Sequence, residues 1–136
     1  MNHPNRQLAR RIWDAIARGD ADTLRSLLAP GLVWRAMARG TPWSGLHQGA
    51  DAAIEMLARV GEAAERFDAQ LVDVLVSDER VGILFHARVG FGGREAELDY
   101  LALARVAGGR FTEIVTVPLD PAALERIWQG RPGEWA

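Results

Sequence analysis

Hydrophobic residues in the first third of the chain recur with the period of an α-helix. Leu8, Ile12 and Ile16 are four residues apart and form one apolar stripe, which predicts an amphipathic helix. Pro4 suits the first turn of this helix, and Gly19 suits its end. We therefore expect a first helix that packs on a core through a single face.

Shorter elements follow this helix. Asp20 can cap a second helix, and Pro30 with Gly31 would end it. The apolar positions of this second helix are Leu24, Leu27 and Leu28. The pattern then predicts a strand over residues 32–37, a loop over 38–48 and a third helix over 49–65.

The second half of the chain alternates apolar and polar residues, which predicts a meander of β-strands. Gly92-Gly93 suits a two-residue hairpin turn, because glycine tolerates positive φ. This turn pairs Phe91 with Arg94, Val89 with Ala96, Ala87 with Leu98, Phe85 with Tyr100, Arg88 with Glu97, and His86 with Asp99. We expect two more hairpins, one with a three-residue loop over 107–109 and one closed by residues 77–80. They pair Ala102 with Ile114, Tyr100 with Thr116, Val72 with Phe85, and Val74 with Ile83.

These registers give the sheet two unlike faces. The first is almost wholly apolar and is expected to face the helices; it carries Val72, Val74, Val76, Ile83, Phe85, Ala87, Val89, Phe91, Leu98, Tyr100, Ala102, Ala104, Ile114 and Thr116. The second mixes charged residues with Leu71, Leu75, Leu84, Leu101, Leu103, Val115 and Val117. Because so much aliphatic surface favours a partner, we expect a homodimer through Leu84, His86, Leu101, Leu103 and Val115. The alternative is a lone sheet face covered by its own charged side chains.

Length and composition narrow the class of protein. The 136 residues suit one domain, so we expect a single domain over 1–136 with a loose tail over 129–136. The chain lacks cysteine and its three histidines lack metal-ligand spacing, so we expect no metal site and no cofactor. A formal net charge of -2 gives no reason to expect binding to nucleic acid or to a membrane. Because the sequence shows neither the apolar core of a signal peptide nor an apolar run long enough to span a membrane, we expect a cytoplasmic protein.

Several segments resemble the nuclear transport factor 2-like superfamily: Gly19-Asp20 and the residues 27–34, 47–51, 99–106, 109–114 and 118–120. The order of elements is also that of the superfamily, and the resemblance covers nearly the whole chain. The chain looks most similar to the SnoaL-like branch, which contains polyketide cyclases and ketosteroid isomerases. The resemblance implies an α+β fold, a cone-like and cystatin-like barrel in which a curved antiparallel sheet wraps around three or four helices. Such a fold encloses a mostly apolar pocket but hosts many activities.

The resemblance also permits a test of catalytic residues. Ketosteroid isomerases use an Asp base together with a Tyr and a protonated Asp that donate to the oxyanion. The corresponding positions here fall on Ala36, Ile12 and Ala102, none of which transfers a proton. The inward face also lacks the carboxylates that epoxide hydrolases of the superfamily use, and no polyketide-cyclase Asp can be placed. The resemblance therefore implies the fold without these catalytic groups.

Candidate ligand-binding residues follow from the inward face and the first strand. The expected wall is Trp34, Trp43, Phe85, Ala87, Val89, Tyr100, Ala102, Ile114 and Thr116. Tyr100 and Thr116 are its polar members, and they either bind a ligand oxygen or satisfy each other. The small residues Ala87, Ala102 and Ala104 leave space, unless Trp13 fills it. For Trp13 we favour plain core packing.

His47, ahead of the third helix, is the candidate proton-transfer group together with Tyr100; the alternative is an exposed loop histidine. The pair His86 and Asp99 resembles a catalytic dyad, but the register places it on the outer face, which favours a structural pair.

Two functional hypotheses remain. The first is a SnoaL-like isomerase, cyclase or hydratase that acts on a hydrophobic ring-bearing substrate, and the second is a non-catalytic dimeric module that binds an apolar ligand or serves as a scaffold.

Overall fold

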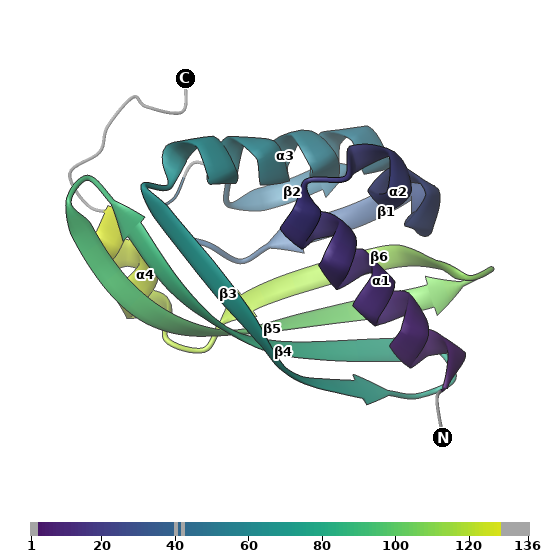
Figure 1. Cartoon of the computed structure of the whole chain (residues 1–136). Coiled ribbons are helices and arrows are strands. Elements are labelled where there is room, and N and C mark those ends of the chain that lie inside the picture. Colours follow the sequence, from purple (N-terminus) through teal and green to yellow (C-terminus); the bar gives the residue numbers. More distant parts are fainter. Residues whose placement is uncertain (1–2, 40, 42, 129–136) are drawn as a thin grey trace.

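The computed structural model describes residues 3–39, 41 and 43–128, and within them the chain forms four helices and six strands (Figure 1). The helices are α1 (Pro4–Arg18), α2 (Ala21–Leu27), α3 (Ala50–Ala63) and α4 (Pro121–Trp128). The strands are β1 (Leu28–Ala36), β2 (Gly45–Gln48), β3 (Arg66–Val76), β4 (Arg80–Phe91), β5 (Arg94–Ala107) and β6 (Arg110–Pro118). The expected tail over 129–136 lies outside the described residues. No helix among the described residues is long and apolar enough to cross a membrane.

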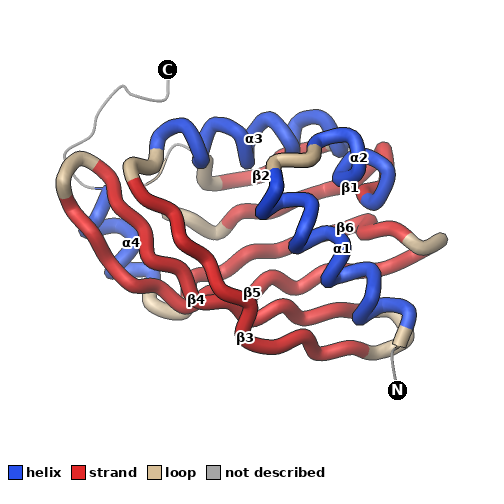
Figure 2. Tube along the Cα trace, viewed as in Figure 1, coloured by secondary structure: helices blue, strands red, loops and turns tan. Residues whose placement is uncertain are grey.

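The six strands form one curved sheet in the order β2-β1-β6-β5-β4-β3. Helices α1, α2 and α3 lie against its concave face, and α4 lies at one end (Figure 2). This arrangement confirms the expected α+β class. Two details of the expectation are wrong: β1 pairs with β6 in parallel, so the sheet is mixed, and its free edges β2 and β3 leave it open, so it is no closed barrel.

Local capping explains where the first helices begin and end. The His3 side chain accepts a hydrogen bond from the Asn5 backbone N–H at the start of α1, and Gly19 ends the helix in the left-handed conformation. Asp20 then caps α2 by accepting from the backbone N–H and the hydroxyl of Thr23. The start and end of α1 and the start of α2 match the prediction to within a residue.

The connection from α2 to β1 differs from the prediction. We expected Leu28 in the helix and a strand over 32–37, whereas β1 runs from Leu28 to Ala36. The register against β6 shifts between Leu28 and Val33, because Pro30 has no N–H to donate to the ladder. The expected loop over 38–48 also contains a strand, since β2 pairs with β1 along residues 45–48.

The hairpin at Gly92-Gly93 has the predicted register, including Phe85 opposite Tyr100 and His86 opposite Asp99. The register of the next hairpin is wrong by two residues. Gly108 and Gly109 both have positive φ and make a two-residue turn, and a bulge follows between Arg105 and Val106. Ala102 therefore lies opposite Thr116, Ala104 opposite Ile114, and Tyr100 opposite Pro118. Because the offset is even, every side chain keeps its predicted face.

A second bulge lies in β3, and because of it one residue that we predicted on the inward face is exposed instead. The register of β3 on β4 pairs Leu71 with Phe85 and Asp73 with Leu84, so Val72 has no partner between them. Val72 was expected opposite Phe85, yet it is 63% exposed. Leu71, expected on the outer face, takes the inward position. The predicted pair of Val74 with Ile83 is confirmed.

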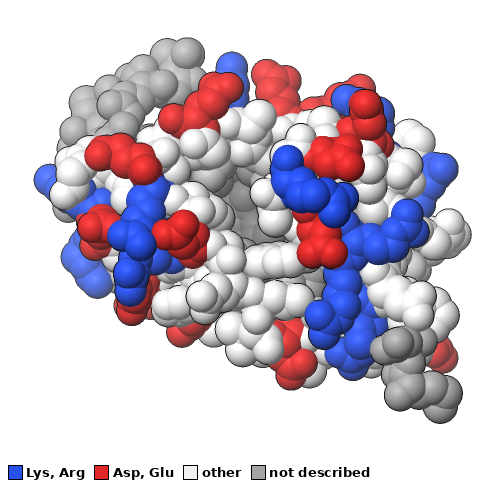
Figure 3. Space-filling view, in the orientation of Figure 1, with Lys and Arg blue, Asp and Glu red and all other residues white. Residues whose placement is uncertain are grey.

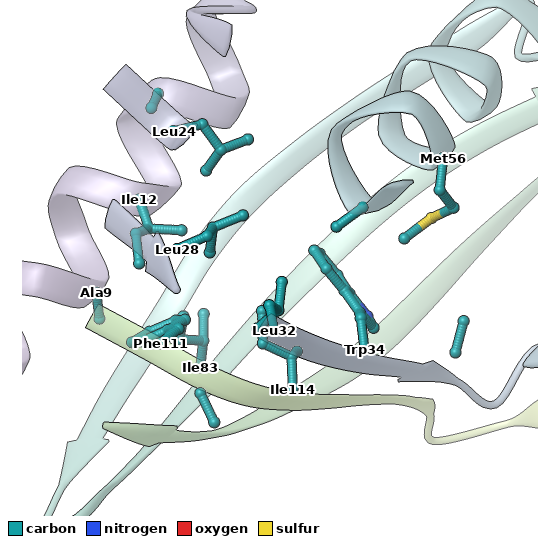
Figure 4. Packing of buried hydrophobic residues seen from close by; sticks show 14 of the residues in the cluster. Ala9, Ile12, Leu24, Leu28, Leu32, Trp34, Met56, Ile83, Phe111 and Ile114 are labelled. Atoms are coloured by element: carbon teal, nitrogen blue, oxygen red, sulfur yellow. The ribbon is translucent and has the colours of Figure 1, made fainter. Parts of the chain in front are cut away.

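The core fills the two ends of the concave face. Its largest fully buried side chains include Phe91, Phe111, Leu28, Leu32, Leu98 and Leu124. Figure 4 shows Trp34 rising from β1 on the side of α3, with Leu32 and Ile114 beside it, and Ile83 and Phe111 farther along the cluster toward Ile12 of α1. Contacts of α1 with β3 and β4, and of α3 with β1 and β2, hold these helices over opposite margins of the sheet. The concave face of the strands between these two helices forms the candidate site described below.

Candidate functional site

The centre of the concave face is open, although both of its ends are sealed. Ala87, Val89 and Leu98 are buried at one end, and Ala104 and Ile114 are buried at the other. Between these two groups lie four half-buried side chains: Phe85, Tyr100, Ala102 and Thr116. They stand on neighbouring strands and point to the same side, so solvent reaches the middle of an otherwise dry surface.

A hollow is visible on the same side of the molecule. Figure 3 shows it near the centre of the view, with walls mainly of uncharged residues. Charged side chains gather on either side of it, over the β4–β5 end of the sheet and over α1 and α2. An apolar recess within a charged surface is the usual form of a small-molecule site.

Three aromatic rings from three elements, α1, β4 and β5, pack together on the concave side of the sheet. The rings of Phe85 and Tyr100 are stacked, with centroids 5.1 Å apart and planes 4° apart. The Trp13 ring of α1 approaches Phe85 at 5.2 Å with a 55° tilt. Trp13 is itself half-buried, so part of its ring remains exposed on the concave side beside Phe85.

The sequence reasoning favoured core packing for Trp13 and a pocket role for Trp34 and Trp43, and Trp13 does pack against the core. The burial has the opposite order, since Trp34 is 6% exposed and Trp43 is 7% exposed. Trp43 packs on Phe91 at 5.7 Å, near the β4–β5 turn. The sequence does hint at the partial exposure of Trp13, because this residue follows Ile12 at the border of the apolar stripe and not at its centre.

The hydroxyl of Tyr100 has no hydrogen-bond partner among the described residues. Burial of the ring raises the pKa of Tyr100 to about 12, because the phenolate would lose its hydration. The group is therefore a protonated hydroxyl at neutral pH, with one donor hydrogen and two acceptor lone pairs. Unpartnered polar groups in a largely apolar surface are uncommon and point to a ligand or to water.

The side chain of Thr116 makes one hydrogen bond among the described residues, and its partner is Trp34. The indole Nε1 of Trp34 donates to the Thr116 hydroxyl oxygen at 3.1 Å. We expected Tyr100 and Thr116 side by side, and this prediction is wrong because of the bulge in the β5–β6 hairpin. They are diagonal neighbours, about 7–8 Å apart at Cα, with Ala102 directly opposite Thr116. Neither hydroxyl therefore satisfies the other.

His47 lies on β2 opposite Trp34, where it was expected in a loop. Its side chain shares the concave face with Trp34 and is half-buried. Its Nε2 donates to the backbone carbonyl of Trp43 at 2.8 Å, which leaves Nδ1 as an acceptor. Three strand spacings separate β2 from β5, about 14 Å along the sheet, so His47 and Tyr100 do not act on one bond.

Carboxylates are absent from the concave positions of the described strands. Asp14 of α1, which would have supplied one from another element, is exposed. The three positions that correspond to ketosteroid isomerase catalytic residues are apolar, and two of them, Ile12 and Ala36, are buried. The described residues contain no cluster of three or more His, Asp and Glu side chains that could hold a metal ion.

The His86–Asp99 pair lies on the convex face, as the register predicts. His86 Nδ1 and Asp99 Oδ1 are 2.7 Å apart, and Arg88 bonds Glu97 at 2.6 Å one row away. Arg88 also lowers the pKa of Glu97, through this hydrogen bond and its charge. These side chains of the convex face bond one another across the two strands, which indicates that they stabilise the sheet and do not form a catalytic site.

Solved structures with the same fold cover almost the entire chain. Bal32a, from a soil-derived mobile gene cassette, is 26% identical with a TM-score of 0.86, and the match covers 93% of this chain and 97% of that one. TerC, co-crystallised with polyporic acid, is 18% identical with a TM-score of 0.80, covering 93% and 98%. A putative SnoaL-like polyketide cyclase from Jannaschia sp. CCS1 is 17% identical with a TM-score of 0.78, covering 93% and 92%.

No curated protein matches the chain by sequence. One family model does match, and it spans residues 9–114, from the first helix to the last strand. This range includes Trp13, Phe85 and Tyr100 of the hollow. The chain belongs to the SnoaL-like domain family, within the nuclear transport factor 2-like superfamily.

Proposed function

We propose that this protein binds an uncharged, ring-bearing small molecule in the hollow of its concave face. The observation that carries the proposal is the half-buried group Phe85, Tyr100, Ala102 and Thr116 at the centre of a sheet face whose two ends are fully buried. Stacked aromatic rings present flat apolar surface to a ring system, and the small side chain of Ala102 leaves room for it. The buried side chains around this group are Trp34, Ala87, Val89 and Ile114.

The relatives support this class of ligand. TerC was co-crystallised with polyporic acid, and the Jannaschia protein is described as a putative polyketide cyclase. Both have the fold of this chain, although their sequence identity is low. A ring-bearing organic ligand in this chain agrees with both descriptions.

A non-catalytic role fits the side chains of the hollow best. Acid–base catalysis needs a group whose pKa lies near the working pH, and the Tyr100 pKa of about 12 is far from it. A second candidate function is an isomerase, cyclase or hydratase in which His47 accepts a proton at Nδ1. The observation in its favour is the hydrogen bond from His47 Nε2 to the Trp43 carbonyl, which presents Nδ1 as a lone-pair acceptor.

The test is a thermal-shift screen with steroids, polyketide-like aromatics and fatty acids. A ligand that binds the folded state raises the melting temperature, and the shift grows with the logarithm of the ligand concentration relative to Kd. Ala102→Trp should fill the hollow and abolish the shift, whereas Ala107→Trp, an exposed position on the same strand, should leave it intact. If no compound shifts the wild type, and Ala102→Trp lowers stability by overpacking, the hollow is closed core and the proposal is wrong.

We also propose that two copies of the chain pair through their convex faces. Leu75 and Leu103 are 53% and 45% exposed there, and Leu84, Leu101 and Val115 are half-buried beside them. Exposed aliphatic surface of this kind favours a self-complementary dimer, with His86 at its border. Sedimentation should give a dimer for the wild type and for Ala107→Glu, but a monomer for Leu103→Glu. A monomeric wild type at tens of micromolar contradicts the dimer.

A further inference from the structure

The first turn of α1 is bonded to the sheet by polar side chains, whereas the rest of its inner face is apolar. The side chains that α1 buries after its first turn are Leu8, Ala9, Ile12 and Ala15. Apolar contacts have no preferred direction, so they hold a helix on a sheet without fixing its place along the strands. Hydrogen bonds are directional and can fix that place.

Asn5 makes the first of these polar contacts. Its Nδ2 donates to the backbone carbonyl of Ser77 at 2.8 Å and to that of Asp78 at 3.0 Å. Both carbonyls lie in the turn that joins β3 to β4, and Figure 2 shows the N-terminal end of α1 beside this turn. Asn5 is buried, so both of its bonds form away from water. A buried amide that bonds residues so distant in the chain ties the helix to the sheet.

Arg6 makes the second contact, with the edge of the sheet. Its guanidinium Nη1 donates to the backbone carbonyl of Val74 at 2.6 Å. Val74 lies on β3, which is an edge strand, and its N–H donates to the Asp73 carboxylate at 2.8 Å. Side chains therefore bond both backbone polar groups of Val74. A hydrogen bond from a charged donor is stronger than one between neutral groups.

We propose that Asn5 and Arg6 are positioning residues, which set the size of the ring system that the hollow accepts by fixing α1 along β3. This inference rests on the proposed function. Trp13 is seven residues after Arg6, so the two lie on one flank of the helix, about 10.5 Å apart along its axis. The ring of Trp13 contacts that of Phe85, and Phe85 belongs to the half-buried group of the hollow.

The spacing along the strand agrees with the spacing along the helix. Phe85 pairs with Leu71 of β3, and Leu71 is three residues before Val74, about 10 Å of extended chain. Helix and strand therefore run in opposite directions, with Arg6 at Val74 and Trp13 at Phe85. A shift of α1 along β3 would change the gap between the Trp13 and Phe85 rings, and with it the room beside Phe85.

The experiment compares 1-naphthol with 1-hydroxypyrene, two uncharged aromatic alcohols whose ring systems differ in size. Kd for each is measured by fluorescence with the wild type, Asn5→Ala, Arg6→Ala, the conservative Arg6→Lys and the control Arg11→Ala, an exposed position of the same helix. Asn5→Ala and Arg6→Ala should raise the affinity for 1-hydroxypyrene relative to 1-naphthol by roughly threefold to tenfold, because the helix is released by the loss of a hydrogen bond. Arg6→Lys keeps a charged donor, so it and Arg11→Ala should keep the wild-type ratio.

A second readout reports the position of Trp13 without a ligand. With 5-fluorotryptophan incorporated, the five tryptophans of the chain give separate fluorine NMR signals, and that of Trp13 is identified by its absence in Trp13→Phe. The Trp13 signal should shift in Asn5→Ala and Arg6→Ala, because it is sensitive to the distance from the Phe85 ring. The signal of Trp34, which is buried on β1, should stay in place.

The two readouts separate this inference from the proposed function. If the wild type binds the probes, an unchanged affinity ratio or an unmoved Trp13 signal in Arg6→Ala would overturn the positioning role and leave the hollow as a ligand site. Arg6 is half-buried, so Arg6→Ala decides the question if Asn5→Ala does not fold. If the wild type binds neither probe, the proposed function is wrong, and this inference is wrong with it.

Discussion

The two faces of the sheet place polar side chains in opposite situations. On the convex face, His86 with Asp99 and Arg88 with Glu97 satisfy one another across β4 and β5. On the concave face of the same strands, the Tyr100 hydroxyl has no partner among the described residues, and its ring is largely withdrawn from water. Paired groups stabilise a sheet without a ligand, whereas an unpaired donor in an apolar hollow gains from one. The comparison therefore directs functional experiments to Tyr100 instead of the dyad-like His86.

The largest expected difference between the faces is in packing. Leu98→Ala removes a side chain that is 2% exposed on the concave face and should lower the free energy of unfolding by about 3 kcal/mol. Leu103→Ala, on the same strand but 45% exposed on the convex face, should cost less than about 1 kcal/mol. Urea unfolding at low protein concentration measures both. Equal losses would show that the convex face is as well covered as the core.

The next effect is the pH dependence that Tyr100 imposes on stability. Its pKa rises from 10.0 to about 12 on folding, so the unfolded chain releases the proton first as the pH rises. Full stability is present below pH 10, and about 2 kcal/mol should be lost between pH 10 and pH 12. The chain has one tyrosine and no cysteine, and all 16 of its basic residues are arginine, so few other side chains titrate there.

Two measurements check this expectation. The absorbance of tyrosinate in the folded protein should titrate near pH 12, and it reports Tyr100 alone because no other tyrosine is present. Tyr100→Phe should lose less stability across the same pH interval than the wild type does. A midpoint near pH 10 would mean that water reaches the phenol freely, and it would weaken the contrast between the faces.

A smaller effect is expected for the convex pair. Asp99→Asn removes the charge that faces His86, and since the two side chains are 64% and 36% exposed, stability should change by less than about 1 kcal/mol. The thermal shift given by a ligand of the hollow should not change, because the pair lies on the other face. A loss of that shift comparable to the loss in Ala102→Trp would contradict the structural role of His86 and Asp99.

The smallest expected effect concerns two glycines of β4 that lie on the convex face. A methyl group at Gly82 would meet Leu75 at 3.7 Å and Leu101 at 3.8 Å, which is ordinary contact. Gly82→Ala should therefore stabilise the fold by about 0.5 kcal/mol, since glycine loses more backbone entropy on folding. At Gly90 the Arg66 Cβ lies at 3.3 Å, so Gly90→Ala should bring no gain. Thermal unfolding of the two variants measures the difference. A Gly82→Ala variant less stable than the wild type would show that a methyl group does not fit there.

The predicted elements succeeded where local chemistry determines them. Gly92-Gly93 permits one hairpin register, and all six of its predicted cross-strand pairs are present. The hairpin at Gly108-Gly109 failed because its turn is shorter than expected and a bulge follows it. Bulges have no strong sequence signature, because their position depends on how the strand twists against its neighbours. The same reason explains the exchange of Leu71 and Val72 in β3.

The sequence by itself determined the α+β class, the family and the face on which nearly every strand residue lies. These properties depend on side-chain period and turn chemistry, which are local. Only the tertiary structure decided that Trp34 and Trp43 are buried while Trp13 borders the hollow. It alone separated Tyr100 from Thr116, and both from His47. Burial and distance depend on how α1 and α3 sit over a curved sheet, and that geometry arises from many contacts between residues far apart in the chain.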